Sequence, residues 1–456
     1  MHSTDKIVVG LDIGTTKICC LVGRRNEFGK LEILGMGKAL SEGVVRGIVS
    51  NIDKTVDAIR KAVRIAEDQA NIDIKLVNVG IAGSHIRSLQ HQGSIMRDSD
   101  SEISIADVKR LSSDMYRLVI QPGSEILHVM PQEYKVDFQE NVTDPVGMGG
   151  RRLEGNFHII TAQSTAIANL RKCVQRAGLE IDNLILEPLA SSMSVLSDEE
   201  KDAGVVLVDI GGGTTDLAIF KDNIIRHAAV LPFGGNIVTQ DIKQGCSVLP
   251  AQAEALKVKF GKAIADEASE DEFISIPGLR DRAPKEISRR NLAHIIEARM
   301  EEVLELVAVE MERVGFAPQD LTAGLVLTGG GAQLQHLVPL AEGITGLETR
   351  IGYPNEHLGK SHVEAVKSPM YATTVGLVLA GYRASLDDRL WKRMEDAEDQ
   401  LHHAAAAAAP SRAEKFFKSG PPKTPKPAGS GGGFLKSFIE RAKGLMIDDL
   451  GDDTNY

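Results

Sequence analysis

Two short glycine-rich segments with the same layout constrain the fold of this chain more than any other feature. Each begins with apolar residues typical of a buried strand, continues with an aspartate, and ends in glycine and threonine. The segments are Leu11–Lys17 (LDIGTTK) and Val208–Asp216 (VDIGGGTTD), and their first aspartates, Asp12 and Asp209, lie 197 positions apart. A strand–Asp–turn unit repeated at this separation predicts two related domains facing each other across a cleft.

The residue types in both segments suit a phosphate chain. Glycine lets backbone N–H groups approach a ligand closely and adopts positive φ without strain, and threonine adds hydroxyl donors. Asp12 and Asp209 would lie at strand ends beside the phosphates, where their charge requires a cation, and Mg²⁺ is the natural one. One such segment alone is equally compatible with a structural turn, but the pair predicts nucleotide binding.

Length and composition exclude several classes of protein. At 456 residues the chain exceeds the limit of about 250–300 residues for one hydrophobic core, so two or more domains are expected. The net charge of −11 argues against general nucleic-acid binding. We expect a protein of the reduced cytoplasm, because the chain has no signal-peptide pattern, no apolar run of about 18 residues and no C-x-x-C spacing among its four cysteines.

Between the glycine segments, the composition and the hydrophobic patterning of the chain change over residues 84–163. This stretch is polar and rich in strand patterns, with one helix expected over Ile105–Ile120, and we interpret it as an inserted α+β module. Further on, Glu187-Pro188 marks a strand-to-helix junction, because proline favours the first turn of a helix. Glu187 is therefore placed either to point into the cleft or simply to cap the helix.

The C-terminal part of the chain has a composition of its own. Residues 391–433 lose apolar content and carry an alanine run, prolines and glycines, which indicates a flexible linker. Residues 434–446 divide completely on a helical projection, with the apolar side chains inside an arc of roughly 140° and Lys, Arg and other small or polar residues opposite. That pattern predicts a helix lying in an anionic membrane interface, although docking on the chain's own body or in a protein groove remains open. The membrane-facing residues are Phe434, Leu435, Phe438, Ile439, Leu445 and Met446.

The order of the motifs carries a resemblance. It runs DIGTTK, EPLASS, DIGGGTTD, LTGGGA and YATTVGLVLAG over residues 7–383. This order resembles the five-part signature of the actin/Hsp70/sugar-kinase ATPase superfamily, and the closest similarity is to the FtsA family of bacterial actin-like cell-division proteins. The resemblance implies an α/β actin-like ATPase fold, with two related domains around a nucleotide cleft, the inserted module and a C-terminal amphipathic helix.

The resemblance also implies domain boundaries. The first actin-like domain would comprise residues 1–83, 164–203 and 371–390, interrupted by the module at 84–163. The second would comprise 204–242 and 315–370, with an outer subdomain at 243–314, followed by the linker at 391–433 and the helix at 434–446.

Site residues follow from the resemblance by position. It implies ATP as ligand, Asp12 and Asp209 at a hydrated Mg²⁺, and Glu187 as the carboxylate that orients the attacking water, with at most weak hydrolysis. Glu254 and Lys257 would lie beside ribose and adenine, although a surface helical ion pair gives the same spacing. The implied phosphate and adenine contacts are Gly14, Thr15, Thr16, Lys17, Gly211, Gly212, Gly213, Thr214, Thr215, Gly329, Gly330 and Gly331.

The partners that the resemblance implies are the C-terminal tail of FtsZ, anionic lipid of the inner membrane, other copies of the chain, and later division proteins bound through residues 84–163. The location would be the cytoplasmic face of the inner membrane at the division septum. Arg290, Asn291 and Arg299 would meet the FtsZ tail, although arginines on a helix usually form a solvated face. A metabolite kinase, an Hsp70-type chaperone and a PilM-like pilus-assembly ATPase are the alternatives, and the tail at 434–446 is the feature that favours the division protein over them.

Overall fold

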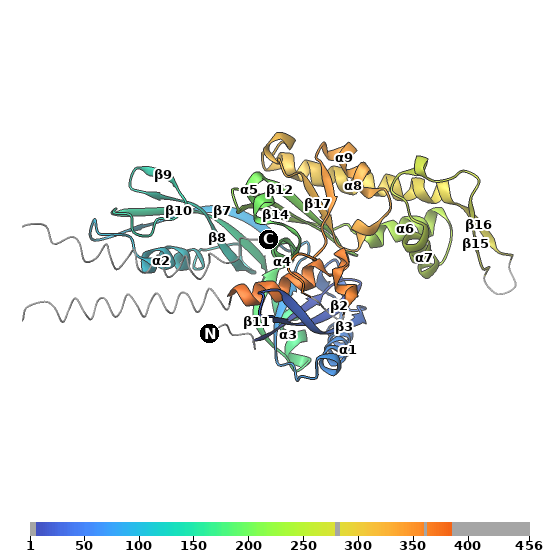
Figure 1. The fold of residues 1–456 in the computed structure, drawn as a ribbon, viewed down its shortest axis with the longest axis horizontal. Coiled ribbons are helices and arrows are strands. Elements are labelled where there is room, and N and C mark those ends of the chain that lie inside the picture. Colours follow the sequence, from blue (N-terminus) through green and yellow to red (C-terminus); the bar gives the residue numbers. More distant parts are fainter. Residues whose placement is uncertain (1–5, 279–282, 360–362, 385–456) are drawn as a thin grey trace, which may run out of the picture. The chain divides into compact units, whose positions relative to one another are not determined.

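The computed structural model describes residues 6–278, 283–359 and 363–384. The first half is organised around a five-stranded sheet in the order β11-β6-β1-β2-β3 (Figure 1). Its strands are β1 (Ile7–Ile13), β2 (Lys17–Arg25), β3 (Leu31–Leu40), β6 (Leu76–Ile81) and β11 (Glu180–Leu186). Strands β1, β2 and β3 are antiparallel neighbours, whereas β1, β6 and β11 are parallel. A two-stranded ribbon, β4 (Val44–Val45) and β5 (Ile48–Val49), follows β3.

The second half repeats this sheet. Its order is β14-β13-β12-β17-β18, so β12 corresponds to β1 and every neighbour runs in the same relative direction. The strands are β12 (Val205–Ile210), β13 (Thr215–Lys221), β14 (Ile224–Leu231), β17 (Leu325–Thr328) and β18 (Thr349–Ile351). The two related domains that the repeated glycine segments predict are therefore present as two sheets of one topology.

Helices cover both faces of the first sheet. Helix α1 (Ile52–Ala70) begins at Asn51, whose side chain caps the helix by accepting the Lys54 N–H, and it packs with α3 (Ser164–Arg176) on one face. Residues 372–384 form a helix on the other face, where Val375 and Val378 are fully buried. The short helices α4 (Glu187–Val195) and α5 (Asp198–Ala203) connect the two halves of the chain.

The second half also contains a helical part, which packs on the β14-β13-β12-β17-β18 sheet and includes the two-stranded hairpin β15–β16. Its core is apolar and includes Leu292, Ile296 and Leu304, all fully buried. The elements are α6 (Gly235–Gly245), α7 (Pro250–Phe260), β15 (Phe273–Ile276), β16 (Lys285–Ser288), α8 (Arg289–Arg313) and α9 (Leu337–Thr345).

The inserted segment forms a four-stranded antiparallel sheet of its own, in the order β7-β10-β8-β9, with one helix (Figure 1). Phe157, Leu153 and Leu111 are fully buried in its separate core. The elements are β7 (Arg87–Met96), α2 (Ile105–Met115), β8 (Ser124–Val136), β9 (Gln139–Val142) and β10 (Arg152–Gln163). Its sheet also touches β14 of the second half.

Two expectations about helices were wrong in detail. Helix α2 ends at Met115 rather than Ile120, because the following segment is mostly exposed: Leu118 packs partly against the module's core, whereas Val119 is completely exposed. The sequence also predicts that a third glycine turn, Gly329–Gly331 after an apolar strand, opens a helix, but it opens only a short 3₁₀ turn, Gly331–Gln333, and α9 begins later, at Leu337. Within the described residues, no helix is both long and apolar enough to cross a membrane.

Candidate functional site

Each glycine segment forms the tight turn of a β-hairpin. In the β1–β2 hairpin the Gly14 N–H donates to the Lys17 carbonyl oxygen at 3.1 Å, and in the β12–β13 hairpin the Gly211 N–H donates to the Thr214 carbonyl oxygen at 2.9 Å. The two turns are therefore equivalent, residue for residue.

The tips of the two hairpins lie against each other. A Cβ added to Gly213 would lie 2.5 Å from the Thr15 hydroxyl oxygen, and one added to Gly212 would overlap the Thr16 side chain. Any side chain at these two positions would therefore separate the hairpins. The sequence predicts that these turns face each other, and the structure brings Thr15 and Thr16 to within contact of Gly212 and Gly213.

The two aspartates that precede the turns are buried. Asp209 accepts hydrogen bonds from the Ser191 hydroxyl at 2.7 Å and the Thr373 hydroxyl at 3.0 Å. Asp12 accepts one from the Thr374 hydroxyl at 3.2 Å and lies 3.4 Å from the Lys17 ammonium. These hydroxyls come from α4 and from the helix at 372–384, so both helices position the aspartates.

Two further carboxylates lie beside this pair. Asp216 faces Asp209 across the β12–β13 hairpin, and its Oδ1 is buried with no hydrogen-bond partner among the described residues. Burial, together with the charges of Asp209 and Asp12, raises the pKa of Asp216 well above its ordinary value. The pKa of Glu187 is raised well above its ordinary value by burial and by repulsion from Asp12, Asp216 and Asp209. Three carboxylates of the two hairpins and a fourth at the start of α4 repel one another, so the site calls for positive charge, and the nearby Lys17 ammonium supplies some.

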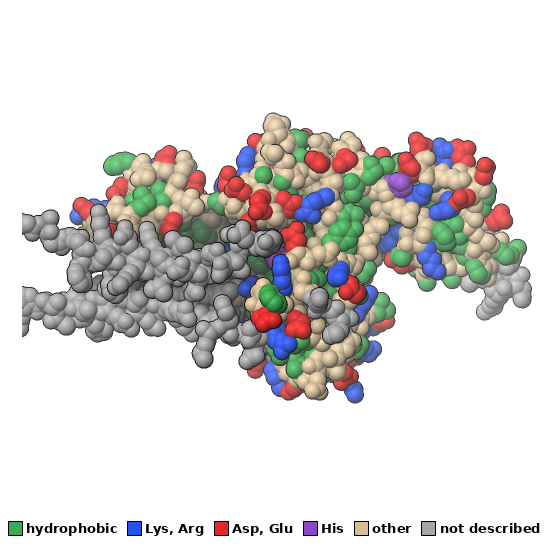
Figure 2. Space-filling model, in the orientation of Figure 1, with side chains coloured by type: hydrophobic (Ala, Val, Ile, Leu, Met, Phe, Trp, Pro, Cys, Tyr) green, Lys and Arg blue, Asp and Glu red, His purple; other side chains and the backbone are tan. Residues whose placement is uncertain are grey.

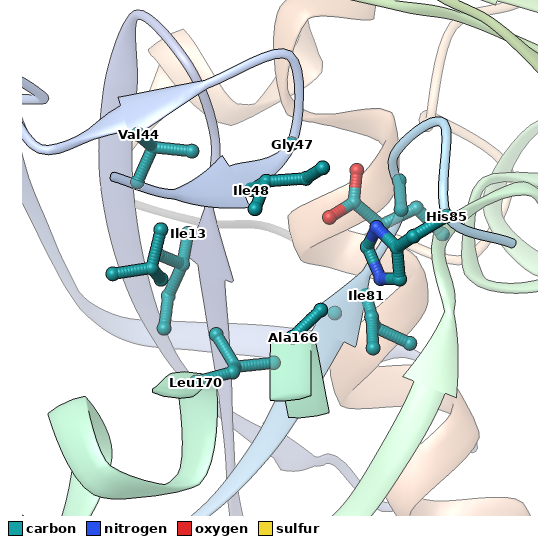
Figure 3. Close-up of a pocket in the computed structure, with 12 residues that line it drawn as sticks. Ile13, Val44, Gly47, Ile48, Ile81, His85, Ala166 and Leu170 are labelled. Atoms are coloured by element: carbon teal, nitrogen blue, oxygen red, sulfur yellow. The ribbon is translucent and has the colours of Figure 1, made fainter. Parts of the chain in front are cut away.

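Glu187 is one of the residues that line a small pocket. The lining of this pocket is mostly apolar, with Ile13, Ile48 and Leu170 around it (Figure 3), and its two ionisable side chains are His85 and Glu187. Both ring nitrogens of His85 are buried without a partner among the described residues, and burial followed by the charge of Arg87 lowers the pKa of His85. The Gly47 N–H, also at this pocket, donates to the Thr15 hydroxyl at 3.1 Å, so the pocket continues towards the first hairpin.

Glu254 and Lys257 connect to the second hairpin through α6. The Lys257 ammonium lies 2.8 Å from the Gly235 carbonyl oxygen, the Thr239 hydroxyl and the Glu254 carboxylate. The Gly235 N–H in turn donates to the Gly211 carbonyl oxygen at 2.9 Å. The pair is therefore more than a solvated ion pair, since it holds the start of α6 against the glycine turn.

The glycine turn after β17, Gly329–Gly331, lies beside Asp209 and Ile210 of the second hairpin. Gly329 has φ +84°, which disfavours any residue with a side chain, and a Cβ there would overlap the Asp209 carboxylate. Both the backbone conformation and the lack of space therefore require glycine at this position. Gly331 packs against Ile210 in the same way, whereas Gly330 is exposed and faces open space.

Arg290, Asn291 and Arg299 lie apart from the hairpins, on α8. Arg290 forms an ion pair with Asp266 at 2.9 Å and a second with Glu270, while Arg299 pairs with Asp241 at 2.6 Å and also with Glu302. Basic and acidic side chains are interspersed over the part of the surface that includes α6 and α7 (Figure 2). An acidic peptide that binds these arginines would have to displace the carboxylates with which Arg290 and Arg299 are already paired. The predicted membrane residues, at 434–446, and the linker, at 391–433, lie outside the described residues.

Several residues of this region were not singled out from the sequence, among them Asp216, Ser191 and Thr373. Asp216 could have been, because it is an acid seven positions after Asp209 at the place where the first hairpin has Cys19. Ser191 and Thr373 gave no signal, since hydroxyl residues are common and their partner, Asp209, is distant in sequence.

Two sheets of one topology, joined at facing glycine hairpins, define the class of protein. A type IV pilus biogenesis complex, PilM–PilN, matches with a TM-score of 0.60 at 16% identity, covering 82% of this chain and 98% of that one. MreB5 of Spiroplasma citri bound to ADP matches with a TM-score of 0.50 at 15% identity, over 86% and 99%. The fold is the actin-like ATPase fold, as the order of the motifs predicts.

Sequence comparison narrows the class to a family. The model for cell division protein FtsA matches residues 206–376, and the model for the SHS2 domain inserted in FtsA matches residues 83–161. Relatives named cell division protein FtsA are 43% identical in Pseudomonas aeruginosa, over 84% of this chain and 91% of the relative, and 37% identical in Escherichia coli, over 85% and 93%. The chain belongs to the FtsA family, and the resemblance drawn from its motifs is confirmed.

Proposed function

We propose that this chain binds ATP together with Mg²⁺ where the two glycine hairpins meet. The observation that carries the proposal is a group of four carboxylates around the two glycine turns: the buried Asp12, Asp209 and Asp216, and the half-buried Glu187 at the start of α4. A buried carboxylate oxygen without a partner, Asp216 Oδ1, is costly unless a cation or a donor satisfies it. The residues present therefore fit a divalent cation and the phosphates that accompany it.

Roles follow for the remaining residues. Backbone and hydroxyl groups of Gly14, Thr15, Thr16 and Lys17 and of Gly211, Gly212, Gly213, Thr214 and Thr215 would contact the phosphates, and Asp12 and Asp209 would hold the hydrated cation. Glu254, Lys257, Gly329, Gly330 and Gly331 would surround the nucleoside. A nucleotide is present in a neighbour of the same fold, since MreB5 of Spiroplasma citri has been solved bound to ADP.

Hydrolysis would be slow and would depend on Glu187. Its carboxylate is placed by the junction of β11 and α4 and can orient a water in the adjoining pocket. Glu187→Ala would lower the rate of ATP hydrolysis and leave ATP affinity unchanged, and an unchanged rate would remove this role from Glu187.

Nucleotide binding is tested by calorimetry on the full chain with ATP and Mg²⁺. Asp209→Asn is expected to weaken binding at least about tenfold, the order seen when groups that support a metal are removed. Asp222→Asn, at the opposite end of β13, is the matched control, because it makes the same chemical change at an exposed turn. Equal affinity of the wild type and Asp209→Asn would contradict the proposed site.

The wider function that we propose is that of a division protein which polymerises at the inner membrane and anchors FtsZ there, at the division septum. The names of its relatives and the helical projection of residues 434–446 support this. A single helix of this length binds lipid weakly, so assembly of many copies would strengthen attachment. The inserted module would serve self-assembly or contacts with later division proteins.

Membrane attachment is tested by co-sedimentation with vesicles containing phosphatidylglycerol, with and without ATP and Mg²⁺. Phe438→Glu should release the full chain, because it places a charge in the apolar face. Ser437→Glu makes the same charge change on the polar face and should reduce binding much less. Undiminished sedimentation of Phe438→Glu would refute the membrane helix.

The FtsZ contact is tested with a fluorescent peptide of the FtsZ C-terminal tail. Arg290→Glu should weaken binding of this peptide, and Arg64→Glu, an exposed arginine of α1, should not. If the peptide binds both variants equally well, the contact does not involve the surface formed by Arg290, Asn291 and Arg299.

A further inference from the structure

The inserted module touches the chain at the residue immediately before Glu187. His128 lies in β8, and its Nε2 accepts a hydrogen bond from the Leu186 backbone N–H at 3.1 Å. Leu186 is the last residue of β11 and the N-cap of α4, whose first residue is Glu187. A side chain of the module thus binds the backbone at the junction that presents Glu187.

This contact adds a polar anchor to a junction that is otherwise held by the pairing of Leu186 with Ile81 of β6 and by the burial of the Leu186 side chain. The N-cap residue is a leucine, so no side chain of the junction caps the helix. The histidine instead holds the N–H of the N-cap residue itself, from a strand 58 positions earlier in the chain.

The imidazole is in the state that this bond needs. An imidazole nitrogen that accepts a hydrogen bond carries no proton, so the proton of neutral His128 is on Nδ1. Burial lowers the pKa of His128 to about 4, which keeps the ring neutral at physiological pH.

The rest of α4 is anchored at the nucleotide site. The Ser191 hydroxyl donates to Asp209, and the Ser194 hydroxyl donates to the Ala372 carbonyl oxygen at 2.8 Å. At Gly376 the helix at 372–384 approaches the Ala190 carbonyl oxygen so closely that no side chain fits between them. Helix α4 is thus held by Asp209 at its centre and by the module at its start, and Glu187 lies between these two anchors.

We propose that His128 is a positioning residue through which the inserted module sets the place of Glu187 and is coupled to the nucleotide site. The inference rests on the proposed function, because it assumes that Glu187 acts on bound ATP. Coupling of this kind is reciprocal, so nucleotide should also change the module near His128.

Hydrogen–deuterium exchange of the full chain tests the bond itself. In His128→Leu the Leu186 amide loses its acceptor and should exchange about 2- to 10-fold faster, the range expected for one net hydrogen bond. His128→Gln keeps an acceptor and should restore part of the protection. His91→Leu is the matched control, since His91 is an exposed histidine of the same module. Unchanged exchange at Leu186 in His128→Leu would overturn the proposal.

Two further measurements test the coupling. With ATP and Mg²⁺, His128→Leu should lower kcat several-fold with little change in KM, because Glu187 is displaced while the phosphate contacts remain, and His128→Gln should recover activity. With AMPPNP and Mg²⁺, exchange across β8 should slow in the wild type and in His128→Gln but not in His128→Leu. Equal kcat, or equal slowing of exchange, in all variants would overturn the coupling.

These outcomes separate the two proposals. A wild-type chain that binds neither ATP nor AMPPNP contradicts the proposed function, and with it the coupling, while exchange at Leu186 still decides whether His128 holds the junction. If the chain binds ATP and its hydrolysis rate falls in Glu187→Ala but not in His128→Leu, only the present inference is contradicted.

Discussion

A buried histidine between the inserted module and the second half makes stability depend on pH. His158 of β10 is 1% exposed, its Nε2 lies 2.9 Å from the Ser88 hydroxyl, and its ring meets the ring of His227 edge to face at 6.4 Å. His227 is held by Glu310 of α8 at 2.8 Å, and Glu310 also pairs with Arg313. Burial, followed by the charge that His227 can carry, lowers the pKa of His158 from 6.5 to about 4.

The direction and size of the effect follow from this difference. As pH falls below 6.5, the unfolded chain binds a proton at His158 that the folded chain does not bind until about pH 4, so protonation favours unfolding between these values. The stability lost is about 2 kcal/mol at pH 5 and about 3 kcal/mol once the pH is below 4.

Urea unfolding of the full chain at pH 8 and pH 5, followed by circular dichroism, tests the reasoning. The stability difference between the wild type and His158→Gln should shrink by about 2 kcal/mol from pH 8 to pH 5, because glutamine has no proton to bind. His91→Gln, at an exposed site on β7, should show the same difference at both pH values. A stability difference for His158→Gln that does not change with pH would refute the argument.

Three other substitutions test the packing and the caps. Gly376→Ala should lower the free energy of unfolding by about 1–3 kcal/mol, because the new methyl group overlaps the Ala190 carbonyl, as thermal unfolding would show. Gly343→Ala, inside α9 with open space at the Cβ position, should instead stabilise by about 0.5–1 kcal/mol, and equal effects of these two substitutions would contradict the contact. Asn51→Ala should cost about 1 kcal/mol in urea unfolding through loss of the α1 cap, and a neutral result would show that the cap contributes nothing.

Local patterns predicted much of this architecture. The two hairpins follow from their repeated residues, because a strand, an acid and a glycine turn are all encoded within nine positions. Helix α1 and its cap at Asn51 are likewise predicted by the sequence, because apolar residues recur at helical spacing from Asn51 to Ala70 and asparagine favours the N-cap position. These features depend on neighbours in sequence, which a single chain displays directly.

Contacts between distant segments could not be predicted in this way. Nothing near His128 indicates that its ring meets Leu186, and nothing near Ser191 indicates Asp209 as its partner. The end of helix α2 depends on where the core of the inserted module ends. The short turn at Gly331 depends on how closely Ile210 approaches it. Such features arise from tertiary packing, which overrides local preference.

The central claim is that the two glycine hairpins hold a nucleotide together, and a crystal structure of the full chain with AMPPNP and Mg²⁺ tests it most directly. The account predicts phosphates against the backbone of Gly14–Lys17 and Gly211–Thr215, with the cation near Asp12 and Asp209. A nucleotide bound elsewhere, or contacts with only one hairpin, would contradict it.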